Sequence, residues 1–119
     1  MDKVKIGPID YAYKLVTDLH DKESGDSKWQ PLFGQIEYGT GEMRISDTLP
    51  PGQRRVTTLH EVIHGVLVNA GIDDHNEVLI SALAHGLVQV LRDNPALVSM
   101  ITEVEGGDSQ TSPDAKAGD

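Results

Sequence analysis

In the first part of the chain, hydrophobic residues alternate with polar ones over short runs, a pattern typical of β-strands. Val4 and Ile6 alternate with lysines, and the Gly7 and Pro8 that follow indicate a turn. Residues 9–19 fit the period of a strand and that of a helix, but their tyrosines favour a strand. We therefore predict two short strands before residue 20.

A hairpin is predicted over residues 34–46. Two alternating runs flank Gly39 and Gly41, which supply a tight turn between them. Before the hairpin, residues 20–31 are polar and rich in turn-forming residues, so we predict a loop there, with Trp29 packed into the core.

In the second half, hydrophobic residues recur every three or four positions, which predicts helices. The first helix spans residues 52–70, and Gly71 ends it. Asp74 is the expected N-cap of a second helix that runs to about Arg92, and residues 96–101 form further turns. The apolar surface of the first helix comprises Val56, Leu59, Val62, Ile63, Val66, Leu67 and Ala70, and that of the second comprises Leu79, Leu83, Gly86, Leu87, Val90 and Leu91.

The length of 119 residues predicts one domain over residues 1–104. Residues 105–119 contain no large apolar side chain and predict a disordered acidic tail. The net charge is −9, and clustered cations are scarce, which argues against nucleic-acid binding. No apolar run resembles a signal peptide or a membrane span, and there is no cysteine. We expect a cytoplasmic protein without disulfides.

The most informative stretch is His60-Glu61-Val62-Ile63-His64, a His-Glu-x-x-His sequence within the first predicted helix. Residues four apart lie on one face of a helix, so His60 and His64 can present two imidazoles to one ion. Two neutral imidazoles suit zinc, and a carboxylate beside a zinc-bound water can accept its proton. This pattern predicts a Zn²⁺ site with Glu61 as general base.

The third protein ligand has several candidates. Position 70 is alanine, which excludes the spacing of three histidines found in metzincins. Glu77 is favoured, because a turn after the first helix would bring the start of the second helix back toward the histidines. Glu77 also fits a capping box that begins at Asp74, and in that role it would serve the helix end instead. The remaining candidates are Asp73, Asp74, His75 and His85.

The His-Glu-x-x-His helix, preceded by a hairpin and followed by a helix ending Leu91-Arg92-Asp93-Asn94-Pro95, resembles small phage-encoded zinc metallopeptidase-like proteins related to the ImmA/IrrE family, which are minimal gluzincins. The resemblance implies an α+β, zincin-like fold. In that fold a small twisted sheet, antiparallel or mixed, packs on the active-site helix and on a second helix. It also implies His60, His64 and Glu77 as zinc ligands and Glu61 as the catalytic base.

The chain departs from the gluzincin pattern after Asn76 and Glu77. Ile80 and Ser81 stand where that pattern has serine and aspartate, so the carboxylate that would orient a ligand histidine is missing there. The leading hypothesis is hydrolysis of a protein or peptide substrate, with Tyr38 or His75 as an added oxyanion donor. The alternatives are a weakly active or inactive zinc-binding protein-interaction module, and an interaction protein without metal.

Overall fold

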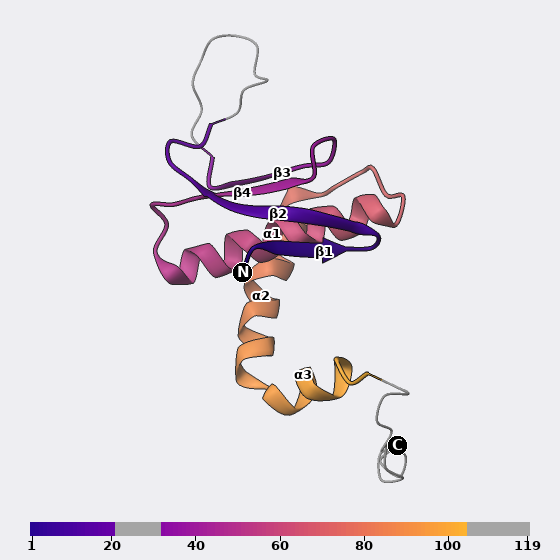
Figure 1. The fold of residues 1–119 in the computed structure, drawn as a ribbon. Helices are drawn as coiled ribbons and strands as arrows, with labels where there is room; N and C mark the ends of the chain where they lie inside the picture. Colours follow the sequence, from indigo (N-terminus) through magenta and orange to yellow (C-terminus); the bar gives the residue numbers. More distant parts are fainter. Residues whose placement is uncertain (21–31, 105–119) are drawn as a thin grey trace. The chain divides into compact units, whose positions relative to one another are not determined.

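The computed structural model describes residues 1–20 and 32–104. Four strands precede three helices (Figure 1), and the predicted α+β class is confirmed. Two compact units divide the chain after Val88, and the candidate site lies within the first. The elements are β1 (Lys3–Ile6), β2 (Ile9–Val16), β3 (Gly34–Glu37), β4 (Glu42–Ser46), α1 (Pro51–Asn69), α2 (Glu77–Asp93) and α3 (Pro95–Ile101).

The structure leaves three of the predictions untested. Residues 21–31 of the loop predicted over residues 20–31, with Trp29, and the tail predicted over residues 105–119 lie outside the described residues. The single domain over residues 1–104 stays a prediction.

The strands form one mixed sheet in the order β1-β2-β4-β3. β1 and β2 form an antiparallel pair around the turn at Gly7, whose φ is +60°. β3 and β4 form the predicted hairpin, also antiparallel. The remaining contact, between β2 and β4, is parallel, and it places β3 at an edge of the described sheet.

The core lies between the sheet and α1, which contacts β1, β3 and β4. Figure 1 shows α1 running along one face of the sheet. Met43 and Ile45 of β4 point into this layer and are fully buried. Because side chains alternate along a strand, their neighbour Arg44 lies on the opposite face. The buried cluster consists of Ile6, Tyr11, Met43, Ile45 and Leu49, with Val4, Tyr13, Ile36 and Val62 packed against it.

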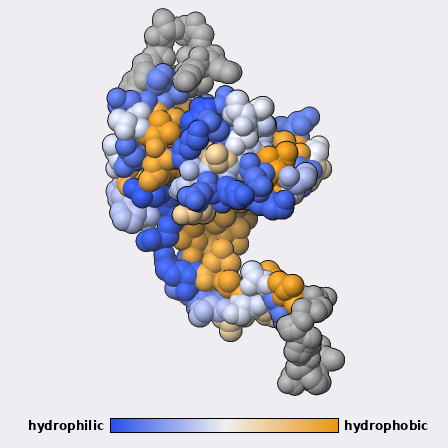
Figure 2. Space-filling view, in the orientation of Figure 1, coloured by the Kyte–Doolittle hydropathy of each residue, from blue (hydrophilic) through white to orange (hydrophobic). Residues whose placement is uncertain are grey.

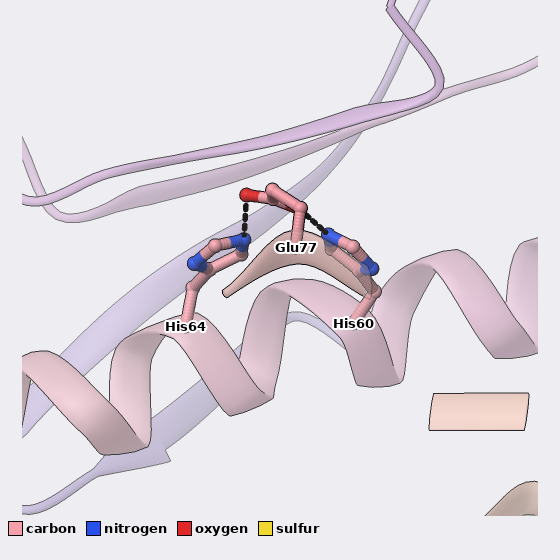
Figure 3. Close-up of side chains that lie close together, drawn as sticks. All are labelled: His60, His64 and Glu77. Atoms are coloured by element: carbon pink, nitrogen blue, oxygen red, sulfur yellow. Dashed lines mark ion pairs between the residues drawn. The ribbon is translucent and has the colours of Figure 1, made fainter. Parts of the chain in front are cut away.

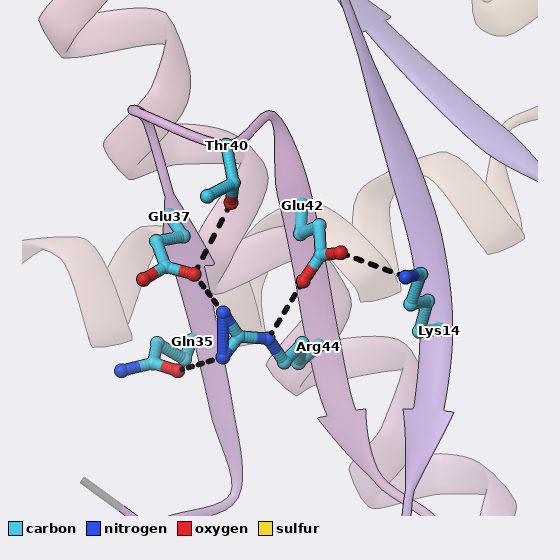
Figure 4. A network of polar contacts seen from close by, with 6 residues as sticks. All are labelled: Lys14, Gln35, Glu37, Thr40, Glu42 and Arg44. Atoms are coloured by element: carbon cyan, nitrogen blue, oxygen red, sulfur yellow. Dashed lines mark hydrogen bonds and ion pairs between the residues drawn. The ribbon is translucent and has the colours of Figure 1, made fainter. Parts of the chain in front are cut away.

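The opposite face of the sheet carries a polar network centred on Arg44 (Figure 4). The Arg44 guanidinium donates to Glu37, to Glu42 at 3.1 Å and to Gln35 at 3.0 Å. Lys14 of β2 donates to Glu42 at 2.7 Å. The network links three neighbouring strands on the face turned away from α1, and so supports the sheet without using any group of the candidate site.

α1 faces the sheet with residues that the hydrophobic pattern did not single out. Its buried residues are Thr57, Glu61 and Gly65, spaced one helical turn apart. The predicted apolar surface is only partly covered, and Val66 is 49% exposed. The reason is that α1 lies very close to the sheet. A Cβ at Gly65 would lie 2.6 Å from Cδ1 of Ile6, so only small or flexible side chains fit on the face of α1 that meets the sheet.

The end of α1 and the start of α2 are defined by main-chain geometry. Gly71 ends α1 as predicted, with φ +82°, and Ile72 donates its N–H to the Leu67 carbonyl at 2.9 Å. The predicted N-cap at Asp74 is wrong. Asn76 caps α2 instead, because its Oδ1 accepts the N–H of Leu79 at 2.9 Å. Glu77 is therefore the first residue of α2 and not the third of a capping box.

α2 buries Ile80 and Ala84, whereas the predicted apolar stripe lies largely exposed. Leu79 and Leu83 of that stripe are 56% and 43% exposed. Figure 2 shows hydrophobic atoms gathered over α2. α3 follows Asn94 and begins at Pro95, one residue before the predicted start, and it has no buried residue. No helix in the described part of the chain is long and apolar enough to cross a membrane.

Candidate metal centre

Two imidazoles of α1 form one side of the candidate site. His60 and His64 lie one helical turn apart, and their ring centroids are 5.0 Å apart. Their side chains are 20% and 13% exposed, so each keeps only a narrow access to solvent. The same helical turn buries Glu61 against the sheet, and this places the histidines at the margin of the core.

Glu77 completes the group from the start of α2 (Figure 3). Its two carboxylate oxygens lie 3.0 Å from Nε2 of His60 and 2.9 Å from Nε2 of His64. All three ligand atoms lie within 4.8 Å of one another. Glu77 can reach them because Asn76 takes the capping role and leaves the carboxylate available. The structure thus brings together the three predicted ligands.

The donor chemistry of this group fits a divalent metal. A carboxylate oxygen only accepts, and an imidazole nitrogen facing it needs a hydrogen or a cation between the two atoms. Glu77 presents such an acceptor to both histidines at once. Two imidazoles and one carboxylate, with hollows beside them, match a zinc site that keeps an open position. Zinc is therefore compatible with the residues present.

Further groups contact the outer nitrogens of both histidines. Nδ1 of His64 lies 2.7 Å from Nδ1 of His75, and Nε2 of His75 lies 2.7 Å from the Ile72 carbonyl oxygen. Ser81 Oγ lies 3.4 Å from Nδ1 of His60. Ser81 can therefore support His60 only weakly, through this long contact. The contact between His64 and His75 was missed, because it depends on the turn at Gly71 and no spacing rule indicates it.

The surroundings of His64 favour a neutral ring. Burial lowers the pKa of His64, and the neighbouring His60 and His75 act in the same direction. The carboxylate of Glu77 opposes them and raises the pKa. Because burial has the largest effect, the net shift is downward, which keeps a nitrogen lone pair available to a metal.

Glu61 is a buried carboxyl beside the three-residue group. Its exposed fraction is 7%. Burial and the charge of Glu77 raise its pKa to about 7, although the N–H of Ile36 donates to it and acts in the opposite direction. A carboxyl with a pKa near neutrality can both accept and return a proton at neutral pH.

Two hollows meet at this site. One, of about 400 Å³, is lined by Tyr38 together with His64 and Glu77. The other, of about 330 Å³, is lined by Phe33, Ser81 and His85 among others. Both include Gly34, His60 and Glu61 in their walls. A ligand could therefore extend to either side of the site.

The other predicted candidates are not part of the three-residue group among the described residues. Asp73 and Asp74 are exposed, and neither belongs to a metal-binding group among the described residues. Nδ1 of His85 lies 2.9 Å from the Ser81 carbonyl oxygen, within its own helix. His75 uses both ring nitrogens for His64 and Ile72, so it has no N–H left for a substrate. Tyr38 remains as the possible oxyanion donor.

Comparison with known proteins adds no assignment. No protein-family model, no curated protein and no solved structure matches the chain. The function must therefore be inferred from the chemistry of the site.

Proposed function

We propose that this protein is a zinc-dependent peptidase of the zincin type. The observation that carries the proposal is the convergence of His60, His64 and Glu77 within 4.8 Å, next to the buried carboxyl of Glu61. Zinc held by these residues would lower the pKa of water at its open position and polarise a scissile carbonyl. The His-Glu-x-x-His sequence of residues 60–64, by which the chain resembles zinc metallopeptidases, favours the same activity.

In this proposal Glu61 is the general base. Its carboxylate accepts a proton from the attacking water and then passes the proton to the leaving amine. The raised pKa, about 7, suits both steps near neutral pH. The N–H of Ile36 donates to the carboxylate and holds it in place while it changes charge.

The edge strand β3 offers a place for an extended peptide. Ser46 donates its N–H to the Phe33 carbonyl at 2.8 Å, so these two residues form a hydrogen-bonded pair of the hairpin. Such pairs alternate with pairs that are not hydrogen-bonded. Gly34 and Ile36 therefore direct their main-chain groups away from β4, along an edge that lines the hollow at the site. Because the N–H of Ile36 donates to Glu61, a substrate strand would pair with the main-chain groups of Gly34 and with the Ile36 carbonyl.

Tyr38 is suited to stabilise the oxyanion. It lines the same hollow as all three proposed ligands. Burial and the neighbouring carboxyl of Glu61 raise the pKa of Tyr38 to about 12, so the phenol keeps its hydrogen and can donate it.

The test begins with zinc content. Wild-type protein and a Glu61→Gln variant, purified without added metal and then offered zinc, should each hold one zinc per chain. Peptide-library digestion read by mass spectrometry should show cleavage by wild type, and a loss on the order of 100-fold to 10,000-fold in the variant. Glu103→Gln, an exposed change outside the site, is the control and should cut normally. Full activity of Glu61→Gln would refute the proposal.

A second candidate is a zinc-stabilised interaction module without turnover. Exposed apolar side chains next to Glu77 favour it: Val78 is 82% exposed and Leu79 is 56% exposed. Such exposure is common where a helix binds a partner. This candidate predicts one zinc per chain, strong stabilisation by the metal, and no cleavage of any library peptide at any pH.

A further inference from the structure

His64 and His75 form one link in a chain of contacts that leads away from the proposed metal. Their ring centroids lie 4.9 Å apart and their planes are inclined by 28°, so the two rings meet edge to edge. The two Nδ1 atoms lie 2.7 Å apart, and Nε2 of His75 lies 2.7 Å from the Ile72 carbonyl oxygen. The chain runs from a main-chain oxygen through two imidazoles to the carboxylate of Glu77.

The carbonyl at one end sets the direction of these hydrogen bonds. A main-chain oxygen can only accept, so His75 carries its hydrogen on Nε2. The lone pair of a neutral His75 is then on Nδ1, where it accepts the Nδ1–H of His64. His64 is left with its lone pair on Nε2, which lies 2.9 Å from an oxygen of Glu77. This tautomer needs a cation between the two atoms, and the proposed metal would supply it.

The carbonyl is itself held in place by the end of α1. Gly71 adopts φ +82°, and the Ile72 N–H donates to Leu67 while that of Gly71 donates to Val68, both at 2.9 Å. This pair of bonds is the usual glycine-dependent helix ending. The position of His75 therefore depends on a rigid turn and not on a mobile side chain alone.

We propose that His75 is a positioning residue, which holds His64 in the tautomer and orientation needed for metal binding. The inference rests on the proposed zinc site and concerns how its ligands are oriented. A histidine that binds a metal through one ring nitrogen commonly donates a hydrogen bond from the N–H of its other ring nitrogen to a carboxylate or a carbonyl. In this chain a second imidazole takes that place at His64. Ser81 has the corresponding position at His60, but its distance of 3.4 Å predicts a weaker contribution.

Two substitutions separate the hydrogen bonds of His75 from the packing of its ring against His64. His75→Phe keeps a ring against His64 but removes both nitrogen contacts. His75→Gln removes the ring, yet its amide can accept from His64 and donate to Ile72. Competition with a chromogenic zinc chelator should show about 10-fold to 100-fold weaker zinc binding for His75→Phe. The loss of zinc affinity should be clearly smaller for His75→Gln, and also for Ser81→Ala.

The control for folding is the circular dichroism spectrum of each variant, compared with wild type. If His75→Phe is poorly folded, His75→Ala replaces it, because this variant also removes both nitrogen contacts and should likewise bind zinc about 10-fold to 100-fold more weakly than wild type. Zinc binding by a folded His75→Phe that equals wild type would overturn the inference. Binding by His75→Gln as weak as by a folded His75→Phe would also overturn it.

A spectroscopic measurement tests the hydrogen bond directly. In protein labelled with ¹⁵N-histidine, an N–H···N bond gives a scalar coupling between the two nitrogens it joins. We expect this coupling between Nδ1 of His64 and Nδ1 of His75, with and without zinc. If wild type takes up no zinc but shows the coupling, the proposed function fails and the histidine pair stands. If zinc binds, and the coupling and the effect of His75→Phe are both absent, the positioning role alone fails.

Discussion

Gly34 of β3 lies so close to Glu61 of α1 that a Cβ at Gly34 would come within 3.2 Å of Cγ of Glu61. The same Cβ would lie 2.7 Å from Cγ2 of Thr57, closer than Cβ atoms normally approach other atoms. This close contact between strand and helix buries the carboxyl of Glu61 and brings it to the N–H of Ile36. The absence of a side chain at Gly34 therefore allows the close packing of β3 on α1 that positions the proposed base, Glu61.

Replacing this glycine should disturb both stability and activity. Gly34→Ala forces Thr57 or the strand to move, and we expect a loss of about 1–3 kcal/mol in the free energy of unfolding. Peptide cleavage should fall as well, because Glu61 shares the contact. Gly39→Ala is the control, since a Cβ there meets nothing within 4 Å. Equal stability of the two variants in urea denaturation would contradict this account of Gly34.

The raised pKa of Glu61 makes the metal-free protein sensitive to pH. The pKa of Glu61 in the folded protein is about 7, whereas the ordinary pKa of a glutamate is 4.5. The folded protein therefore holds this proton more tightly, and stability falls as pH rises between these two values. A shift of this size corresponds to about 3 kcal/mol.

Glu61→Gln removes the titration, so its advantage in stability over wild type should grow between pH 4.5 and 7. Urea denaturation in the presence of a chelator, at pH 4.5, 6 and 8, measures the difference. If the free energies of unfolding of the two proteins differ by the same amount across this range, the pKa of Glu61 is not raised in the folded protein.

Glu77→Ala tests the third ligand. Removing its carboxylate leaves two imidazoles for the metal, and we expect zinc content after dialysis to drop from one per chain to nearly none. Asp74→Ala is the matched control, because Asp74 is an exposed acid close by that lies outside the ligand group. If Asp74→Ala loses zinc and Glu77→Ala keeps it, the ligand assignment is wrong.

Local signals in the sequence predicted most elements of the fold. The turn at Gly7, the hairpin turn at Gly39 and Gly41, and the stop at Gly71 each depend on neighbouring residues alone. The parallel pairing of β2 with β4 joins segments that are distant in the sequence, and no local pattern encodes it. The buried face of α1 was also missed, because close packing against the sheet selects Thr57 and Gly65 for size rather than hydrophobicity.

In the candidate site, too, local patterns in the sequence predict some residues, whereas the roles of others depend on three-dimensional contacts. Helical spacing predicts His60 and His64 as ligands, and the turn expected after the first helix favours Glu77 as the third. The role of Glu77 depends on which residue caps α2, and the structure has Asn76 in place of the predicted Asp74. Both residue types are good N-caps, so the residue type alone does not decide between them. The role of His75 depends on where the Ile72 carbonyl points, which only the three-dimensional turn determines.

Zinc should stabilise the protein by an amount that follows its affinity. Ligands that bind only the folded state add about 2.7 kcal/mol when present at 100 times the dissociation constant. We therefore expect the melting temperature in zinc to exceed that in chelator, with a smaller difference for His64→Ala. Calorimetry with stepwise zinc additions measures the trend. A melting temperature that does not respond to zinc would exclude specific binding to the folded state.

Tyr38→Phe should separate oxyanion stabilisation from metal binding. Loss of one preorganised donor costs about 100-fold in kcat, whereas KM and zinc affinity should change little, because the hydroxyl acts mainly in the transition state. Tyr13→Phe is the control: its hydroxyl lies 2.8 Å from Thr58 Oγ1. That variant should lose about 1 kcal/mol of stability and keep its kcat. Equal kcat values for Tyr38→Phe and wild type would assign the oxyanion to another donor, since the pKa of about 12 keeps the Tyr38 hydroxyl protonated at every pH of the assay.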